Sequence, residues 1–267
     1  MHGRVLIIAG SDSGGGAGIQ ADIKAVTALG GYAATALTAL TAQDTITVHG
    51  VHEVPIDFVA QQIEVVLRDL GADALKTGML HSPAVLNCVA DTVEREAPGV
   101  PLVMDPVMVA KGGASLLLEE ARARLRERLI PLAHVITPNV PEGEILSGMD
   151  IADEDAMRAA GEALLELGPQ AVLMKGGHLE GPEVVDLLIT RDGTERFSGP
   201  RIDSKHTHGT GCSLASALAT GIAQDLTLSQ AVRRARAYVL EAIRTAPGYG
   251  NGHGPLNHAH TMRTFDG

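Results

Sequence analysis

The sequence has few aromatic residues and a deficit of positive charge, and these two shortages exclude several classes of protein. It contains no Trp, three Phe and three Tyr among 267 residues, so it lacks the aromatic platforms on which single-stranded nucleic acids stack. Its formal net charge of -11 repels phosphate backbones and anionic membrane surfaces. We therefore expect no nucleic acid and no membrane as partner, and a small molecule as the ligand.

Cysteines are also scarce, and long apolar runs are missing. Cys88 and Cys212 are the two cysteines, too few for a disulfide framework in a chain of this length, which indicates a reducing compartment. The apolar run after Met1 is too short for a signal-peptide core, and no apolar run reaches the length of a membrane span. We therefore expect a cytoplasmic protein.

What the sequence does have is a regular alternation of short apolar runs and amphipathic segments. The runs include RVLIIAG, ADALKTGM, PLVMDPVM, HVITPN and AVLMKGG. Such runs separated by helices are typical of a mostly parallel β-sheet covered on both faces. VVDLLITRDGTERFSG departs from this pattern, because Asp192-Gly193 predicts a hairpin and an antiparallel edge. The sequence predicts an α/β fold and, since no linker divides the chain, a single domain over residues 1–267.

A glycine-rich loop, HGTGC at 208–212, precedes a helical segment. Gly209 and Gly211 allow backbone N–H groups to turn toward one point, and the following helix adds unpaired donors and the positive end of its dipole. Such a loop binds phosphate, although an ordinary glycine-rich connection fits equally well. The helix N-terminus would lower the pKa of Cys212 and make it a base or nucleophile; close packing of a small residue is the alternative. His208 leaves a Cys/His hydrolase open.

Polar side chains follow several predicted strands, at the edge where open parallel sheets bind ligands. Asp105 ends a strongly apolar strand, and Asn139 and Glu142 follow the next one. Their oxygens suit Mg²⁺, which prefers the company of phosphate, while helix capping or a turn is the alternative role of the two carboxylates. Lys175 ends a further strand, where its ammonium can face a phosphate chain or simply lie in a surface turn.

Two other strand ends indicate how a ring could be held. The amide of Gln43 presents a donor and an acceptor side by side, which is the pattern that pairs with the edge of an aminopyrimidine. Met79 can lie against the face of a ring where aromatic side chains are scarce. Either residue could instead be structural, so the two positions identify a candidate pocket rather than a proven one.

The segment GSDSGGGAGIQAD suggests a different class of protein. Gly16, Gly18 and Ala21 fit the dinucleotide fingerprint GxGxxA, which would favour an NAD-dependent oxidoreductase. In that motif the first glycine follows the strand closely, whereas here several residues separate Gly10 from Gly16. A loop that covers the substrate fits this spacing better.

The chain as a whole resembles the hydroxymethylpyrimidine/phosphomethylpyrimidine kinases of thiamine biosynthesis, which are members of the ribokinase-like superfamily. The resemblance rests on the segments IAGSDSGGGAGIQADIKAVTALGGYAATALTALTAQDT, GML, MDPVMVAKGG, TPNVPE, VLMKGGH and THGTGC. It implies a three-layer sandwich, ATP as phosphoryl donor, Mg²⁺ and a homodimer. It also implies phosphorylation first of the hydroxymethyl group of 4-amino-5-hydroxymethyl-2-methylpyrimidine and then of the monophosphate.

The same resemblance implies roles for particular residues. Those implied in catalysis are Cys212, Gly209, Thr210, Gly211 and Lys175. Those implied around the substrate are Gln43, Gly10, Asp22, Met79 and Asp105. Asp105 and Glu142 are implied near the metal, and Asn139, Lys175 and Gly211 near the nucleotide phosphates.

Cys212 marks a branch within the superfamily. The wider superfamily usually has an aspartate at this position, which deprotonates the accepting hydroxyl, whereas the pyrimidine kinases and their pyridoxal-kinase relatives resemble this chain in having a cysteine. A pyridoxal kinase is therefore one alternative function. A non-catalytic pyrimidine-binding protein is the alternative from another class.

Overall fold

A nine-stranded β-sheet runs through the part of the chain that the computed structural model describes, residues 1–109, 113 and 116–263. The strand order is β3-β2-β1-β4-β5-β6-β7-β8-β9. The strands from β2 to β7 in this order are mutually parallel, and antiparallel pairs lie at both edges. The strands are β1 (Arg4–Asp12), β2 (Tyr32–Gln43), β3 (Val48–Glu53), β4 (Ala74–Thr77), β5 (Leu102–Met104), β6 (Val135–Ile136), β7 (Ala171–Lys175), β8 (Glu183–Thr190) and β9 (Gly193–Pro200).

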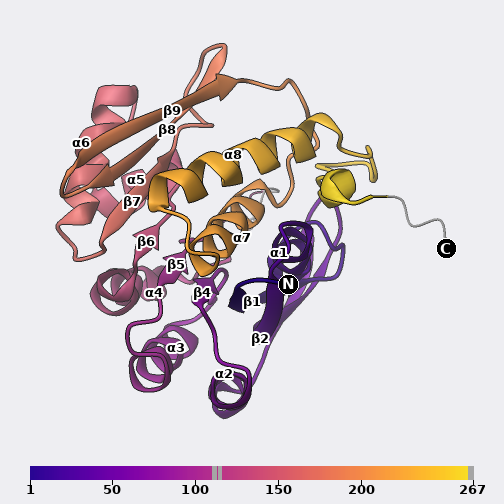
Figure 1. Ribbon diagram of the computed structural model, residues 1–267, viewed down its shortest axis with the longest axis vertical. Helices are drawn as coiled ribbons and strands as arrows, with labels where there is room; N and C mark the ends of the chain where they lie inside the picture. The colour runs from indigo at the N-terminus through magenta and orange to yellow at the C-terminus, as the bar shows by residue number, and fades with distance from the viewer. Residues whose placement is uncertain (110–112, 114–115, 264–267) are drawn as a thin grey trace.

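Helices cover both faces of this sheet (Figure 1). One face carries α1 (Gly18–Ala28), α7 (Thr210–Ala223) and α8 (Leu228–Arg244). The other carries α2 (Ile56–Asp69), α3 (Pro83–Glu96), α4 (Glu119–Arg124), a π-helical turn (Leu125–Leu129), a short 3₁₀ turn (Ile130–Leu132), α5 (Val140–Ser147) and α6 (Glu154–Leu165). A further 3₁₀ turn spans His258–Thr261. The three-layer arrangement predicted from the sequence is confirmed.

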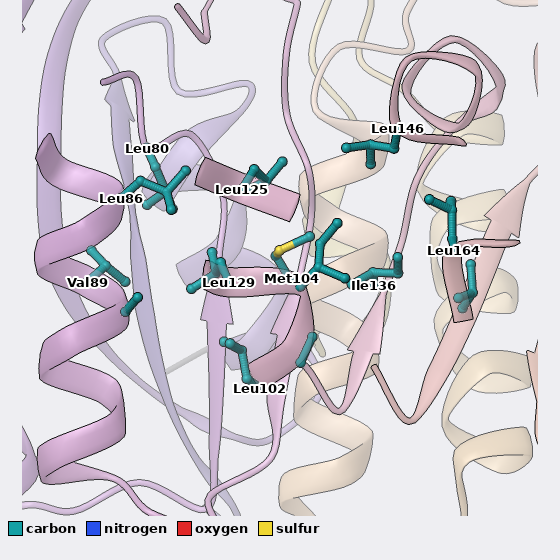
Figure 2. Close-up of a cluster of buried hydrophobic side chains, with 14 of the residues drawn as sticks. Leu80, Leu86, Val89, Leu102, Met104, Leu125, Leu129, Ile136, Leu146 and Leu164 are labelled. Carbon is teal, nitrogen blue, oxygen red and sulfur yellow. The ribbon is translucent and has the colours of Figure 1, made fainter. Parts of the chain in front are cut away.

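The alternation of side chains along β1 explains the two hydrophobic cores. Val5 and Ile7 point toward α1 and α7, whereas Leu6 and Ile8 point toward the opposite layer, because successive side chains of a strand face opposite sides. In the second core, shown in Figure 2, Leu86 and Val89 of α3 pack near Leu102 and Met104 of β5 and near Leu125 and Leu129 of the π-helical turn. Each such buried side chain contributes about 1.5–3 kcal/mol, so the strand ends are held rigidly from both faces.

The antiparallel edge formed by β8 and β9 is confirmed, but a second antiparallel edge was not foreseen. β3 pairs antiparallel with β2 and is almost entirely exposed. The connection at 44–47 is too short for the crossover that a parallel neighbour needs. Asp44 stabilises this turn, because its Oδ1 accepts hydrogen bonds from the N–H groups of Ile46 and Thr47 at 2.8 and 2.9 Å.

Two further observations concern the sequence expectations. Within the described ranges, the structure contains no helix with the length and apolar character of a membrane span. The segment MDPVMVAKGG is described at 104–109 and at Gly113, and positions 110–112 lie outside the described residues.

Candidate active site

A cleft of about 1110 Å³ opens at the carboxyl ends of the parallel strands. Because these ends lie along one edge of the sheet, side chains that are distant in sequence meet there. The predicted site residues that line the cleft are Gly10, Gln43, Met79, Asp105, Asn139, Glu142, Lys175, Gly209, Thr210, Gly211 and Cys212. Asp22 is the one predicted site residue that does not.

Gly209 fixes the entry of the chain into α7. It is the residue before the helix and has a φ of 82°, a left-handed conformation that favours glycine. A Cβ at this position would lie 1.8 Å from the carbonyl oxygen of Gly16. The loop at 13–17 therefore packs directly against the start of α7, and only glycine permits that approach.

The first turn of α7 presents free amide groups to the cleft. The first hydrogen bond along the helix is donated by Ser213 N–H to Gly209 O at 2.9 Å. Before it, Thr210 N–H donates to Thr207 O at 3.3 Å. The N–H groups of the two residues between them, Gly211 and Cys212, have no acceptor within the helix. With the helix dipole behind them, they form a site for an anion.

A lysine and a carboxylate converge on the same point. Lys175 Nζ donates to Asp105 Oδ1 at 3.0 Å, and Thr137 Oγ1 donates to the same oxygen at 3.1 Å. A Cβ added to Gly211 would lie 3.4 Å from Lys175 Nζ and 3.5 Å from Asp105 Oδ2. Burial alone would lower the pKa of Lys175, but the charges of Asp105 and Glu142 outweigh it and raise that pKa. Lys175 is thus a fixed cation beside the anion site.

Glu142 and Asn139 form the N-terminal cap of α5. Asn139 Oδ1 accepts from Glu142 N–H at 2.9 Å, and Glu142 Oε2 accepts from Asn139 N–H at 2.8 Å, which is a capping box. The capping role named as the alternative is thus present in both side chains. Burial raises the pKa of Glu142 to about 7, against the attraction of Lys175 and with the repulsion of Asp105.

The arrangement of carboxylates limits how a metal would be held. Among the described residues no group of three or more His, Cys, Asp or Glu side chains is placed to bind a metal ion. Asp105 and Glu142 nevertheless face the cleft, and Mg²⁺ commonly takes one or two carboxylates and otherwise keeps water and phosphate oxygens. The residues therefore fit a Mg²⁺ that arrives with a nucleotide, and not a protein cage.

The expected lowering of the Cys212 pKa is wrong. Burial raises the pKa of this thiol to about 12, and the carboxylates of Asp22 and Asp105 act in the same direction. The nearby Lys76 ammonium and a hydrogen bond from the Gly18 backbone oppose the rise without cancelling it. The loss of water around the sulfur therefore outweighs the helix terminus.

Asp22 lies beneath the cleft rather than on its wall, which corrects its predicted contact with the substrate. Its side chain is fully buried. Asp22 Oδ2 accepts from Lys76 Nζ at 2.9 Å and Oδ1 accepts from Ser216 Oγ at 2.7 Å. Since Lys76 belongs to the cleft lining, Asp22 acts on the site through this lysine and through its charge on Cys212.

Gln43 and Met79 line the cleft beside Gly10 of β1 and Ser13, which follows that strand. A Cβ on Gly10 would come within 2.3 Å of Met79 Cε, so the bare backbone of Gly10 packs against the thioether. Ser13 Oγ donates to Gln43 O and accepts from Gln43 N–H, both at 2.9 Å. The loop therefore anchors the backbone of Gln43, and its side chain faces the same cleft as Cys212.

Sequence reasoning missed Lys76 and Asp12. A signal for Lys76 was present, because a lysine inside an apolar strand is costly unless it is paired, and the same reasoning identified Asp105. Asp12 accepts a hydrogen bond from His208 Nε2 at 3.0 Å, and His208 also contacts Gln43. These contacts place His208 beside Gln43 and do not support a Cys/His hydrolase.

The fold and the cleft are those of a ribokinase-like kinase. The crystal structure of an ADP complex of Bacillus subtilis pyridoxal kinase matches with a TM-score of 0.89 at 35% identity, over 97% of this chain and 98% of that one. The family model for phosphomethylpyrimidine kinase matches residues 12–257. The chain belongs to the phosphomethylpyrimidine kinase family, which excludes the NAD-dependent oxidoreductase.

Curated relatives agree with this family. The hydroxymethylpyrimidine/phosphomethylpyrimidine kinase of Bacillus subtilis (strain 168) is 47% identical over 256 residues, which cover 96% of this chain and 94% of the relative. The thiamine biosynthesis bifunctional protein ThiED of Geobacter sulfurreducens is 52% identical over 257 residues, which cover 96% of this chain. The chain spans about half of that relative's length, 52%.

Proposed function

We propose that the protein transfers a phosphoryl group from ATP to the hydroxymethyl group of 4-amino-5-hydroxymethyl-2-methylpyrimidine, and then a second one to the monophosphate. The observation that carries this proposal is the convergence of the α7 amides, Lys175 and Asp105 in one cleft with Gln43 and Met79. The names of the two curated relatives favour the pyrimidine. Pyridoxal is the second candidate substrate, because the solved pyridoxal kinase shares the fold closely.

Phosphoryl transfer passes through a loose transition state, so the protein mainly positions the reactants and neutralises charge. The amides of Gly211 and Cys212 hold the transferring phosphoryl group, and Lys175 faces the phosphate chain. Asp105 and Glu142 would hold Mg²⁺, which neutralises phosphate charge when bound. Asn139 lies beside the same phosphates, at the start of α5.

Cys212 stands where a base would accept the proton of the substrate hydroxyl. Because its pKa is raised to about 12, only a small fraction of the sulfur is thiolate near neutral pH, but that thiolate is a strong base. Lys76 favours this charged form electrostatically. Gln43 and Met79 hold the ring at the end of the cleft that Cys212 also lines.

ADP release with three acceptors in parallel tests the function. The acceptors are the hydroxymethylpyrimidine, its monophosphate and pyridoxal, each with saturating ATP and Mg²⁺. We expect turnover with both pyrimidines and a lower kcat/KM with pyridoxal. Faster turnover with pyridoxal would assign the protein to the second candidate function, and pyrimidine binding without ADP release would make it a non-catalytic binding protein.

The rest of the proposal concerns the domain organisation, oligomeric state, location and cofactors. We expect residues 1–267 to act as one kinase domain, and the protein to form a homodimer in the cytoplasm, with ATP and Mg²⁺ as the nucleotide and the metal. Sedimentation equilibrium tests the dimer. Dependence of ADP release on added Mg²⁺ after treatment with a chelator tests the metal.

A further inference from the structure

Asp12 is a buried carboxylate whose oxygens are surrounded by donors. It is 2% exposed. Its Oδ1 accepts from Gly14 N–H at 2.8 Å, and its Oδ2 accepts from Gly16 N–H at 3.0 Å and Ala17 N–H at 2.8 Å. Although burial raises the pKa of Asp12, hydrogen bonds from His208 and from these amides bring it below its usual value. Asp12 is therefore an acceptor only.

The charge of Asp12 determines where His208 carries its proton. His208 is 8% exposed, and its Nε2 lies 3.0 Å from Asp12 Oδ2. A bare ring nitrogen there would set its lone pair against those of the carboxylate. Nε2 therefore carries a hydrogen and donates it to Asp12.

This proton in turn decides how the amide of Gln43 is oriented. Gln43 Nε2 is placed 3.3 Å from His208 Nε2, and Gln43 Oε1 is placed 3.4 Å from Thr41 Oγ1, but the two ends of an amide have the same shape and are assigned from the hydrogen bonds they make. Thr41 already donates its hydroxyl hydrogen to Ser11 O at 2.8 Å, so its oxygen can only accept. In that placement the amide NH₂ faces the N–H of His208, donor against donor, and the amide oxygen faces an oxygen that can only accept. With the amide turned over, its oxygen shares the His208 Nε2 hydrogen with Asp12 Oδ2 in a three-centre bond, and its NH₂ donates to Thr41 Oγ1.

We infer that the Asp12–His208 pair locks the Gln43 amide in this single orientation and so fixes the order of acceptor and donor that the ring meets. This inference rests on the proposed function. It makes Asp12 and His208 positioning residues, since they act on the ring through Gln43.

The locked amide distinguishes two kinds of pyrimidine. A 4-amino ring offers an exocyclic donor beside the ring nitrogen N3, an acceptor. A 4-oxo ring offers an exocyclic acceptor beside the N3–H donor, the reverse order, and would pair equally well with Gln43 turned over. A free amide turns over readily, but a locked one must leave polar groups unpaired against the 4-oxo ring. Because the proposed substrate is a 4-amino ring, the locked order is the one that pairs with it, and the 4-oxo ring is disfavoured.

Calorimetric binding of the 4-amino ring and its 4-oxo analogue, without nucleotide, tests the lock. We expect wild type to prefer the 4-amino ring by at least ~100-fold, and His208→Ala to reduce that preference by roughly tenfold or more while ADP binding stays unchanged. His208→Gln, which keeps a donor, should retain most of the preference. His208→Asn, whose donor is too short to reach Gln43, should reduce the preference as His208→Ala does. It takes the place of His208→Ala if that variant does not fold. His134→Ala, before β6 at the opposite end of the strands, is the matched control.

A double-mutant cycle adds the test that a purely structural role would not meet. In a Gln43→Ala background, His208→Ala should weaken pyrimidine binding by less than about twofold, because the group it orients is gone. Equal weakening with and without Gln43, or an unchanged preference in His208→Ala, would overturn the lock alone. A wild-type protein that binds neither pyrimidine would refute the proposed function, and the lock with it.

Discussion

Two lysine–aspartate pairs lie in the cleft region and differ in burial. The fully buried pair has a structural role, and the partly exposed pair can contact a ligand. Lys76 and Asp22 are both fully enclosed, with side chains 0% exposed and Ser216 as a third partner. In the second pair Asp105 is nearly as buried, at 2%, but Lys175 is 12% exposed and faces the start of α7. A lysine–aspartate pair thus serves as a buried charge at the floor of the cleft in one case and as a candidate contact for a ligand in the other.

Burial is the main cause of the raised pKa of Cys212, and the two pairs modify it. The sulfur feels the enclosed pair and Asp105 together, and the two carboxylates offset much of the help that Lys76 gives to the thiolate. In a site that excludes water, each of these charges acts more strongly than at a surface. Substitutions in the two pairs, in Cys212 and in Glu142 can therefore separate catalysis from stability.

The largest effect is expected at the sulfur itself. Cys212→Ala should lower kcat by ~10²–10⁴-fold with little change in KM, which is the usual contribution of a positioned base. Because the thiol is protonated below a pKa of about 12, wild-type kcat should rise as the pH increases above neutral. Steady-state ADP release over that pH range is the measurement, and Cys212→Asp is the comparison variant, expected to lose the alkaline rise. A Cys212→Ala variant with full kcat would remove the sulfur from the mechanism.

Lys175→Met should act on turnover next most strongly. Removing one group that stabilises developing charge commonly costs ~10²–10³ in kcat. Because Lys175 is partly exposed and water can replace its ammonium beside Asp105, the loss of stability should be smaller than in Lys76→Met. Stopped-flow phosphoryl transfer and thermal unfolding should be compared on the same sample. Loss of stability in proportion to the loss of rate would show that this pair is structural as well.

Lys76→Met should act most strongly on stability, and it should also lower kcat because Lys76 favours the Cys212 thiolate. It leaves Asp22 buried without its ion-pair partner, which typically destabilises a protein by about 3–5 kcal/mol. Urea unfolding gives the free energy, and the double variant Lys76→Met/Asp22→Asn should recover most of the loss. Arg128→Ala, which breaks an exposed pair with Asp91, is the control and should cost at most about 1 kcal/mol. Equal losses in the buried and exposed variants would contradict the contrast.

The smallest effect concerns Glu142 and pH. Burial raises the pKa of Glu142 from its ordinary 4.5 to about 7, so between these values the folded protein binds more protons than the unfolded one. Stability should therefore fall as pH rises through that window, by about 1–3 kcal/mol. Glu142→Gln preserves the capping pattern and should show a flatter profile in chemical denaturation. Parallel profiles for both proteins would refute the shift.

The sequence was sufficient for the layers and for most of the cleft. Polar residues at the ends of buried strands, such as Asp105 and Lys175, had to meet because parallel strands end at one edge of the sheet. The glycines at 209 and 211 signalled a close approach of backbone, and the structure shows these approaches to Gly16 and to Lys175.

What escaped prediction depends on depth and on partners from distant segments. Asp22 lies beneath the floor because α1 packs on α7. There its carboxylate accepts hydrogen bonds from Ser216 of α7 and from Lys76 of β4. The thiol pKa of Cys212 depends on how much water the surrounding elements exclude, which sequence spacing does not reveal. Glu142 was recognised as a cap or a ligand, and only the geometry showed the capping bonds in place.

Gly211→Val is the substitution that tests the point of convergence most directly. The added Cβ would lie 3.4 Å from Lys175 Nζ and 3.5 Å from Asp105 Oδ2, and the two methyl groups beyond it would crowd the same point. We predict that this variant folds and still binds the hydroxymethylpyrimidine, but that its rate of ADP release falls by at least ~100-fold. A folded Gly211→Val protein with the wild-type rate would show that the phosphoryl group is transferred somewhere else.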